Sequence, residues 1–526
     1  MAAAIALGSV RIIATYSVFN HTVDEPAHLA SGMEWLDRGT YKMEDQHPPL
    51  ARVLAALGPY LDGARLQGVW DKDPTHAGMY EEGQYDYYAG DHYQRTLTLA
   101  RLGILPCFWI ACLAVWLWAR RYFGIPTGVV AVGLFSFLPP ILAHAGLGTT
   151  DMALTAFLGT AFLALLAWGE NPTLRRSALF GLAGGLAVLS KFSSLAFFPA
   201  AVAAALVAYI VAARPGLGSL VAHFRRLALP LWIAIAVAAL VIWAGYRFHY
   251  GPTPFGVSLP APELYSGIRS VMQHNRDGHP SYLLGQHSLF GWWYFFPVVL
   301  AVKTPFPFLV LAIFGAVVCL TRFREKAGAY VMPLAFALAI LGVGMAGNIN
   351  VGIRHILPIY IGLSIVAAVG TVRLYEFARR AAWAKVGLAG LAGWLAITSL
   401  AAHPDYLPYF NFIAGSQPER IVADSDLDWG QDMTRLGKRM RQLGANRLTF
   451  QPLVFDFYDK RGLPPLDFGS PFAPAPGWNA VGLTMWKVMR MGLSPPATPW
   501  PDRTTVKPVE RVGKSILLYY FPPGRP

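Results

Sequence analysis

A pair of acidic residues, Asp24 and Glu25, follows the first apolar segment of the chain within the string HTVDEPAHLASGMEW. A carboxylate at the water-facing end of an apolar helix can accept a proton, because ionised groups are cheap in water and costly in lipid. Another acid, Asp151, precedes a later apolar segment. Spacing alone leaves a second interpretation open, since Asp24–Glu25–Pro26 and Asp151 also suit helix starts.

Three basic residues, Lys191, Lys303 and Arg354, stand close to apolar segments. Cations in such places can bind an anion such as a phosphate, and charges between apolar segments often mark functional sites. Each also has a structural interpretation. Lys191 could extend to the membrane surface, Lys303 could be an interface anchor, and Arg354–His355 could cap the following helix.

The composition indicates that lipid is the main solvent of the elements that position these residues. Of the 526 residues, 55% are apolar and only 14% are charged, against about 25% charged in soluble domains. Mean hydropathy is +0.40. The net charge of +13 comes largely from basic residues in short gaps between apolar segments, so we expect no nucleic-acid partner. The three cysteines lie in apolar segments and predict no disulfide framework.

About eleven segments are apolar enough to cross a bilayer as helices. They lie at roughly 2–19, 97–118, 126–144, 152–168, 177–190, 192–213, 226–247, 304–320, 328–346, 356–374 and 384–402. The basic clusters fall in alternate gaps between them, which predicts that those gaps are cytoplasmic. The clusters are Arg120–Arg121, Arg175–Arg176, Arg214 with Arg225–Arg226, Arg322/Arg324/Lys326 and Arg373/Arg379/Arg380/Lys385.

This topology places the remaining gaps and the C-terminus outside the cytoplasm. The first segment lacks a basic start and a clear cleavage site, so we expect a retained helix rather than a signal peptide. The outward segments 20–96 and 287–303 are rich in aromatic residues, which favours helices that lie on the membrane and line a cavity. The fold class expected is an all-α polytopic membrane bundle, residues 1–402 with outward loops 20–96 and 248–303. A C-terminal extracytoplasmic α/β domain is expected at 403–526, where RIVADSDLDWGQDMTRLGKRMRQLG predicts a strand, an acidic turn and a helix, and NRLTFQPLVF and KSILLYYF predict strands.

Taken in order, several short motifs resemble the GT-C superfamily of membrane glycosyltransferases, nearest to protein O-mannosyltransferases and the aminoarabinose transferase of lipid A. The motifs, which span about residues 1–400, are Asp24–Glu25, His47–Pro48–Pro49–Leu50, Thr150–Asp151, Leu189–Ser190–Lys191, Trp292–Trp293–Tyr294 and Arg354–His355. One departure is His47, where relatives on the lipid A side often carry a lysine thought to hold the lipid phosphate. A histidine takes that role as a cation only when it is protonated.

The resemblance implies an inverting transfer of a sugar from a polyprenyl-phosphate lipid donor to an acceptor on the extracytoplasmic face of a bacterial inner membrane. The catalytic residues expected are Asp24, Glu25 and Asp151. The donor phosphate is expected at Lys191, Lys303, Tyr294, Arg354 and His47, and the cavity is expected to be lined by His28, Trp292, Trp293 and His355. The acceptor could be a protein, a lipid or a cell-wall glycan, and neither it nor the sugar is encoded in these motifs.

A divalent metal is a further hypothesis, because His28 lies four residues after Asp24 and could share a ligand with it and with His47. No cofactor is otherwise expected. The acidic turn DSDLDWGQD, residues 424–432, resembles a calcium loop but lacks the glycine and the terminal glutamate of an EF-hand. A helix-capping turn is the simpler interpretation.

Two other classes of protein fit the same composition. A lipid or glycan transporter or flippase would also place charges in a helical bundle, but it would favour broken helices at mid-membrane and two matching halves. A scaffold protein would not need the acidic pair.

Overall fold

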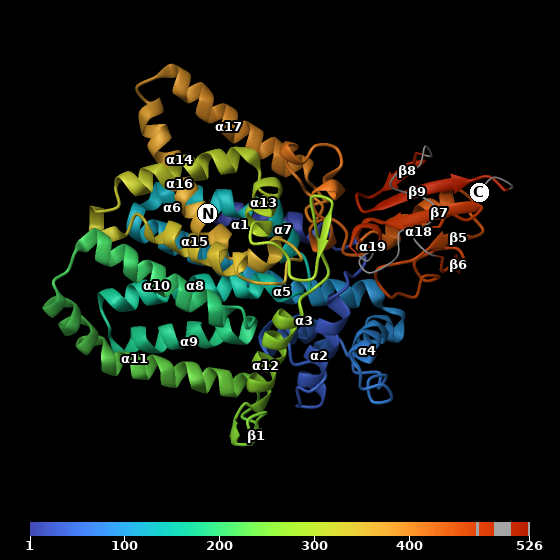
Figure 1. Ribbon diagram of the computed structural model, residues 1–526, viewed down its shortest axis with the longest axis horizontal. Coiled ribbons are helices and arrows are strands. Elements are labelled where there is room, and N and C mark those ends of the chain that lie inside the picture. Colours follow the sequence, from blue (N-terminus) through green and yellow to red (C-terminus); the bar gives the residue numbers. More distant parts are fainter. Residues whose placement is uncertain (470–472, 489–506, 524–526) are drawn as a thin grey trace.

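The computed structural model describes residues 1–469, 473–488 and 507–523, and it is mostly helical. A long bundle forms most of the chain, and a small sheet lies at one end of it (Figure 1). Its helices are α1 (Ala2–Ile13), α5 (Tyr93–Phe123), α6 (Ile125–Ser136), α7 (Pro139–Ala145), α8 (Asp151–Glu170), α9 (Leu174–Ser190), α10 (Ser194–Ala213), α11 (Leu217–Gly245), α13 (Phe295–Lys303), α14 (Phe306–Thr321), α15 (Met332–Met345), α16 (Ile359–Ala378) and α17 (Ala382–Ala401).

Within the described residues, six helices are long and apolar enough to cross a membrane, and up to eight spans result if two bent pairs each count as one. The bent pairs are α6 with α7, at 66°, and α13 with α14, at 117°. Three other predicted spans appear as the shorter helices α1, α9 and α15. With about 1.5 Å of rise per residue, the 12 residues of α1 cover only about 18 Å of a hydrocarbon core of about 30 Å. The predicted count of about eleven spans is therefore not confirmed.

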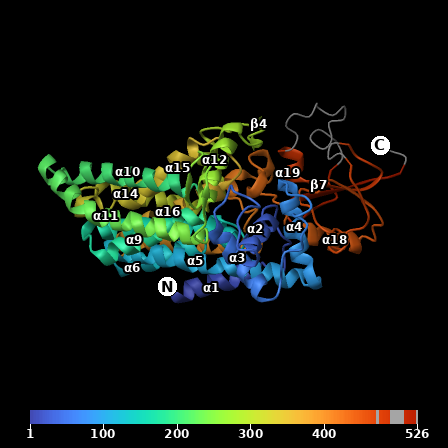
Figure 2. The same cartoon turned by 90° about the horizontal axis from the view of Figure 1, so that it is seen from below.

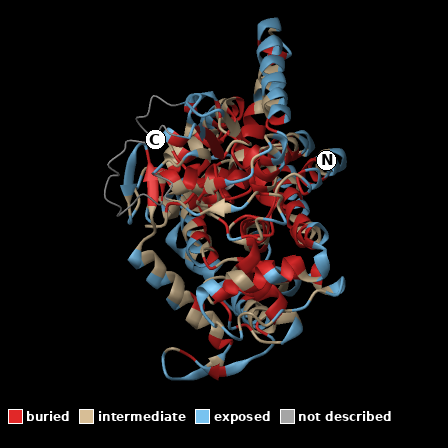
Figure 3. Ribbon diagram, turned by 90° about the vertical axis from the view of Figure 1, so that its right-hand side faces the viewer, coloured by how far each residue is buried: buried red, intermediate tan, exposed pale blue. Residues whose placement is uncertain are grey.

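The outer helices show that the chain is a multi-pass membrane protein. Helix α11 is strongly apolar and has only Leu227 and Ala234 buried, and α17 has the same character, with only Ala384 and Ser399 buried. In Figure 3, α17 is the exposed helix that rises above the buried centre of the bundle. Exposed apolar faces of this length are stable in lipid and not in water.

Close helix packing holds the centre of the bundle together. At Gly315 on α14, an added Cβ atom would lie 2.0 Å from the carbonyl oxygen of Val366 and 3.2 Å from the backbone nitrogen of Gly370, both on α16. Only glycine permits this approach, which is typical of helix pairs in membranes. The bundle is seen from another side in Figure 2, with the sheet again beyond one end.

The segments predicted to face outward gather at that same end (Figure 1). Residues 20–96, for which helices were predicted, contain the α-helices α2, α3 and α4, and α2 packs against both α3 and α4. Of the segment 287–303, only the part from Phe295 is helical. The elements at this end are α2 (Glu25–Asp37), α3 (Pro49–Leu61), α4 (His76–Tyr88), η1 (Ala89–Asp91), α12 (Pro262–Asp277), η3 (Ile353–Ile356), the hairpin β1 (Tyr250–Pro252) with β2 (Ser258–Pro260), and the hairpin β3 (Ser281–Leu283) with β4 (Gln286–Ser288).

The C-terminal segment contains the helix and both of the strands predicted after the acidic turn. The strand predicted before the turn is wrong, because Pro418–Arg420 form η5 and only Val422 makes an isolated bridge, to Leu283. The sheet has the order β6-β5-β7-β9-β8, in which β5 is parallel to β6 and β7 while β9 is antiparallel to its neighbours. Helix α18 contributes Met433, Leu436 and Met440 to the core beneath the sheet. The elements are η4 (Phe412–Ala414), η5 (Pro418–Arg420), η6 (Asp424–Asp426), α18 (Met433–Gln442), β5 (Leu448–Phe450), β6 (Leu466–Asp467), β7 (Gly477–Gly482), α19 (Leu483–Lys487), β8 (Glu510–Val512) and β9 (Ile516–Phe521). The domain boundary at residue 403 stays a prediction.

Candidate active site

Asp24 is the residue before the first residue of α2, yet its carboxylate makes no capping hydrogen bond in the described structure. Instead, Asp24 Oδ2 accepts a hydrogen bond of 2.9 Å from Nη1 of Arg354. Oδ1 makes no hydrogen bond to any described residue. The Asp24 side chain is 20% exposed, so this oxygen can meet a molecule that enters from solvent.

Asp151 is the first residue of α8 and its side chain is completely buried. Its Oδ1 atom accepts a hydrogen bond of 2.6 Å from Lys191 Nζ, and its Oδ2 atom lies 3.9 Å from Arg354 Nη1. Lys191 follows α9 directly, in extended backbone before α10. A buried carboxylate needs such partners to stay charged. Asp151 therefore pairs with Lys191 and lies close to Arg354, the arginine that is bonded to Asp24.

These contacts form a row of alternating charges, Asp24–Arg354–Asp151–Lys191, built from four separate parts of the chain. The two cations are each 12% exposed, and Asp24 is the more exposed of the two carboxylates. The row can therefore offer a partly exposed proton acceptor and two partly exposed cations as phosphate ligands.

Glu25 belongs to a different network. Its side chain is completely buried and bonds to Arg101 through Nε and Nη2, each at 2.8 Å. The backbone N–H groups of Gly148 and Thr22 also donate to it, at 2.9 and 2.8 Å. Burial alone would raise the pKa of Glu25, but Arg101 and these donors outweigh it and lower that pKa. Glu25 thus stabilises the start of α2.

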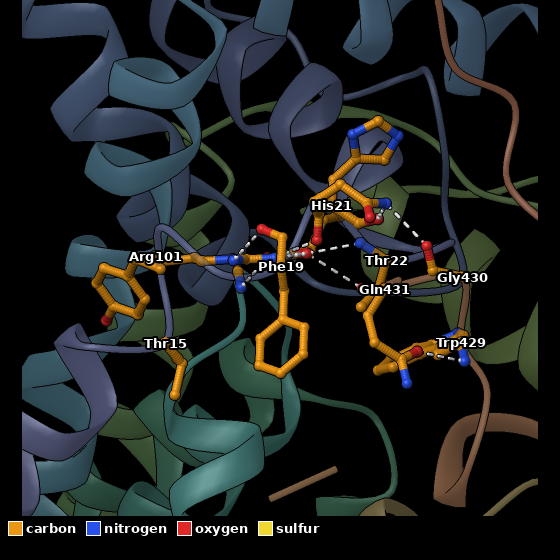
Figure 4. Close-up of polar contacts among 12 residues, drawn as sticks. Thr15, Phe19, His21, Thr22, Arg101, Trp429, Gly430 and Gln431 are labelled. Atoms are coloured by element: carbon orange, nitrogen blue, oxygen red, sulfur yellow. Dashed lines mark hydrogen bonds and ion pairs between the residues drawn. The ribbon is translucent and has the colours of Figure 1, made fainter. Parts of the chain in front are cut away.

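Arg101 also fixes the chain that leads to Asp24. Its guanidinium donates to the carbonyl oxygens of Phe19, at 3.2 Å, and Asn20, at 2.8 Å. Figure 4 shows this side chain extended toward Phe19, with Trp429 and Gly430 of the acidic turn on the other side of the same segment. Arg101 on one side and the acidic turn on the other therefore restrict the position of Asp24.

His28 and His47 are close together beside the charged row, with ring centroids 5.3 Å apart. Arg52 Nε donates to His28 Nδ1 at 3.0 Å, so the His28 ring carries its proton on Nε2. Burial, followed by Lys191, lowers the pKa of His47 to about 4. At neutral pH, His47 is uncharged and can offer a phosphate only a neutral N–H donor.

The remaining predicted residues differ in their distance from the row. His355 follows Arg354 directly in η3, and burial, followed by Lys191, lowers its pKa. The Lys303 ammonium is buried and donates to the carbonyl oxygens of Leu407 and Asp426, at 2.6 and 2.5 Å.

The aromatic block lies apart from these charges. Tyr294 is partly buried and packs edge-on to exposed Trp293, and the backbone N–H of Trp292 donates to Asn350. Among the described residues, the structure shows no contact of Asp24, Asp151 or Lys191 with the side chains of Lys303, Trp292, Trp293 or Tyr294.

Among the described residues, no group of three histidine, cysteine or acidic side chains is arranged to hold a metal ion. The metal hypothesis stays untested.

Two arginines and the acidic turn belong to the site region but were not predicted for it. Arg101 lies inside an apolar segment, which is a signal that could have been used. Arg52 follows the Pro-Pro element and forms an ion pair with Glu44. Ser425 and Trp429 contact Arg354 from a distance of more than seventy residues along the chain, and no local pattern encodes that contact.

A family model described as dolichyl-phosphate-mannose-protein mannosyltransferase matches residues 95–244, which include Asp151 and Lys191. No curated protein sequence matches the chain.

Solved structures resemble the chain more completely. The crystal structure of ArnT from Cupriavidus metallidurans bound to undecaprenyl phosphate matches 98% of this chain and 97% of the ArnT chain, with 15% identity and a TM-score of 0.52. The apo state of ArnT gives the same coverage and identity and a TM-score of 0.51. An Archaeoglobus fulgidus oligosaccharyltransferase in the apo form matches over 84% of this chain and 58% of its own, with 14% identity and a TM-score of 0.47.

The chain therefore has the fold of ArnT over nearly its whole length. The resemblance to GT-C membrane glycosyltransferases is confirmed by this fold and by the mannosyltransferase model.

Proposed function

We propose that the protein is an inverting glycosyltransferase that moves a sugar from a polyprenyl-phosphate donor to an acceptor at the extracytoplasmic face of a bacterial inner membrane. The observation that carries the proposal is the row Asp24–Arg354–Asp151–Lys191, which has an accessible carboxylate at one end and two cations behind it. ArnT, which has the same fold, was crystallised with undecaprenyl phosphate, a lipid of the class proposed as the donor's carrier.

In the proposed reaction, the bond between the anomeric carbon and the donor phosphate oxygen breaks, and that oxygen keeps the electron pair. The acceptor oxygen attacks the anomeric carbon from the opposite face and loses its proton to Asp24. One displacement of this kind inverts the anomeric centre. Arg354 and Lys191 stabilise the charge that grows on the departing phosphate, because cations act most strongly where water is largely excluded.

Asp151 serves this reaction indirectly. Without its carboxylate, two neighbouring cations would repel each other in a buried place. We therefore assign Asp151 to positioning Lys191 and Arg354, and Asp24 to contact with the acceptor. Glu25 and Lys303, whose charges are used inside the protein, are assigned to supporting the site rather than binding donor.

The test uses the purified protein in liposomes with a panel of polyprenyl-phosphate sugars and candidate protein, lipid and glycan acceptors. Release of free polyprenyl phosphate together with appearance of the sugar on an acceptor supports the proposal. If every donor stays intact while a donor lipid crosses the bilayer, the proposal is wrong and a flippase is the better description.

A further inference from the structure

The acidic turn, residues 424–432, has a role that the proposed reaction does not yet include. Its sequence DSDLDWGQD places four aspartates within nine residues, but the described structure uses their carboxylates inside the protein. Asp426 accepts from Ile353 N at 3.0 Å, and Asp428 accepts from Thr484 N at 3.0 Å. Asp432 accepts from Ser515 Oγ at 2.7 Å. These contacts join the turn to η3, through Ile353, and to the C-terminal segment, through Thr484 and Ser515.

Two of the aspartates attach the turn to the C-terminal sheet. Asp428 is bound by Thr484, the second residue of α19, whose hydroxyl also donates to the Asp428 carbonyl at 2.6 Å. Asp432 is bound by Ser515, the residue before β9. Both carboxylates are buried and hydrogen-bonded, so they attach the turn to the C-terminal sheet region.

The opposite side of the turn holds Arg354. Arg354 Nε donates to Ser425 Oγ at 3.1 Å, and the guanidinium carbon lies 4.1 Å from the centre of a Trp429 ring. Ser425 Oγ in turn donates to the carbonyl oxygen of Val351 at 2.6 Å. The Trp429 side chain is buried, so its ring has little freedom to move away.

The same turn also holds the backbone beside Asp24. The Trp429 carbonyl oxygen accepts a hydrogen bond of 3.1 Å from Val23 N, and the Gly430 carbonyl oxygen accepts one of 2.8 Å from Asn20 Nδ2. Asn20 Oδ1 accepts from Met433 N at 2.8 Å. Figure 4 shows Trp429 and Gly430 facing Thr22 and His21 across this junction.

The geometry points to a positioning role for the acidic turn: Trp429 and Ser425 set the Arg354 guanidinium, and the Trp429 carbonyl sets the Asp24 backbone, so that the two site residues meet. This inference deepens the proposed function and rests on it for its catalytic consequence. It makes the C-terminal sheet part of the catalytic unit, since the turn is fastened to that sheet.

An arginine side chain has many rotamers, so without further contacts the Arg354 guanidinium could pair with its two nearby carboxylates in several orientations. Asp24 Oδ2 and Asp151 Oδ2 lie 2.9 and 3.9 Å from Arg354 Nη1. The position of the guanidinium over the Trp429 ring and the hydrogen bond that Nε donates to Ser425 Oγ restrict the orientation of the Arg354 side chain. Nη1 is then left to reach Asp24 and Asp151.

The experiment is a double-mutant cycle on the full-length protein in liposomes, with release of free polyprenyl phosphate as the readout. The variants are Trp429→Leu, Trp429→Phe, Arg354→Gln and the double variant Trp429→Leu/Arg354→Gln. Trp478→Leu is the matched control, because Trp478 packs against Tyr520 in the same sheet, away from Arg354.

We expect Trp429→Leu to lower the transfer rate about 10²-fold, the cost of a small misplacement at a reacting centre. Trp429→Phe keeps an aromatic face and should lose no more than about tenfold. The double variant should be no slower than Arg354→Gln alone, because Trp429 acts through Arg354. The inference is overturned if Trp429→Leu matches the Trp478→Leu control, or if the two losses multiply in the double variant.

The inference can also fail separately from the proposed function. If the wild-type protein transfers no sugar, the proposed function fails, and the same cycle is measured as midpoints of thermal unfolding in detergent. Contact between the two side chains predicts that the double variant shifts the midpoint by less than the sum of the single shifts. Additive shifts would then overturn the positioning role as well.

Discussion

Arg354 Nη1 lies 2.9 Å from Asp24 Oδ2, although the two residues are 330 positions apart in the chain. The pair joins the start of α2 to the turn before α16. Arg354 is shared with Asp151, and Asp151 is shared with Lys191, so the charge of each member depends on the others. The predictions below follow from this row and from the contacts around it.

Replacing Lys191 should weaken the binding of polyprenyl phosphate. We expect Lys191→Gln to lower the affinity about ten- to hundredfold, because a charge-assisted hydrogen bond to a phosphate oxygen is lost. Lys191→Arg keeps the charge and should lose less. Titration of purified protein with the lipid phosphate in detergent measures both. Equal affinity of Lys191→Gln and wild type, with unchanged thermal unfolding, would remove Lys191 from the phosphate site.

Replacing Glu25 should affect stability first. Glu25→Gln leaves Arg101 charged, buried and unpaired, which costs about 3–5 kcal/mol. The midpoint of thermal unfolding in detergent reports this loss. Glu170→Gln is the control, because Glu170 pairs with Arg121 at the surface and such pairs contribute at most about 1 kcal/mol. Similar midpoints for the two variants would show that the buried pair is not what stabilises the start of α2.

The low pKa of His47 predicts a loss of stability in mild acid. In the unfolded chain, His47 takes up a proton near its ordinary pKa of 6.5, whereas the folded protein resists protonation until about pH 4. The free energy of unfolding therefore falls as the pH drops through this window, by at most about 3 kcal/mol for this residue. Denaturant unfolding at pH 7 and pH 5 measures the change.

The control for this prediction is His47→Gln. Other groups also titrate in this window: burial raises the pKa of Asp424 to about 7, which opposes the loss, and burial lowers the pKa of His279 to about 4, which adds to it. Comparing the wild type with His47→Gln removes the contribution of these other groups to the pH dependence. The wild type should lose more stability than His47→Gln between pH 7 and pH 5, and an equal loss would show that His47 is protonated in the folded state.

The proposed orientation can be tested with single cysteines. The native Cys107, Cys112 and Cys319 are buried, so a membrane-impermeant maleimide should label introduced cysteines selectively. We expect Lys72→Cys, an exposed position in the first outward segment, to be labelled in intact spheroplasts. Arg379→Cys, exposed between α16 and α17, should be labelled only after permeabilisation. The reverse pattern would place the charged row in the cytoplasm.

The residues of the charged row could be singled out from the sequence because membrane chemistry restricts where charges can stand. Asp24, Asp151, Lys191 and Arg354 were expected at the ends of apolar segments, and the structure brings these four together. The count of spans was less predictable. Apolar content predicts a span over 2–19, but it does not say that α1 ends at Ile13, nor that α15 is limited to the 14 residues Met332–Met345.

Other features depend on tertiary contacts that leave no local signal. Glu25 and Asp24 are neighbours of the same chemical type, yet α2 directs one toward Arg101 and the other toward Arg354. Lys303 was expected to bind a lipid phosphate, but in the structure its ammonium donates hydrogen bonds to two backbone carbonyl oxygens. The contact of Trp429 with Arg354 requires the C-terminal sheet to fold against the bundle, which apolar periodicity cannot predict.

The most direct test of the central claim is the transfer rate of Asp24→Asn in liposomes, with a polyprenyl-phosphate sugar that the wild type uses. The substitution keeps the shape of the side chain but removes the proton acceptor, so we expect release of the lipid phosphate to fall about 10²- to 10⁴-fold with unchanged unfolding. Asp71→Asn, which alters an exposed ion pair with Arg38, should transfer sugar at the wild-type rate. A rate for Asp24→Asn equal to that of Asp71→Asn would contradict the account.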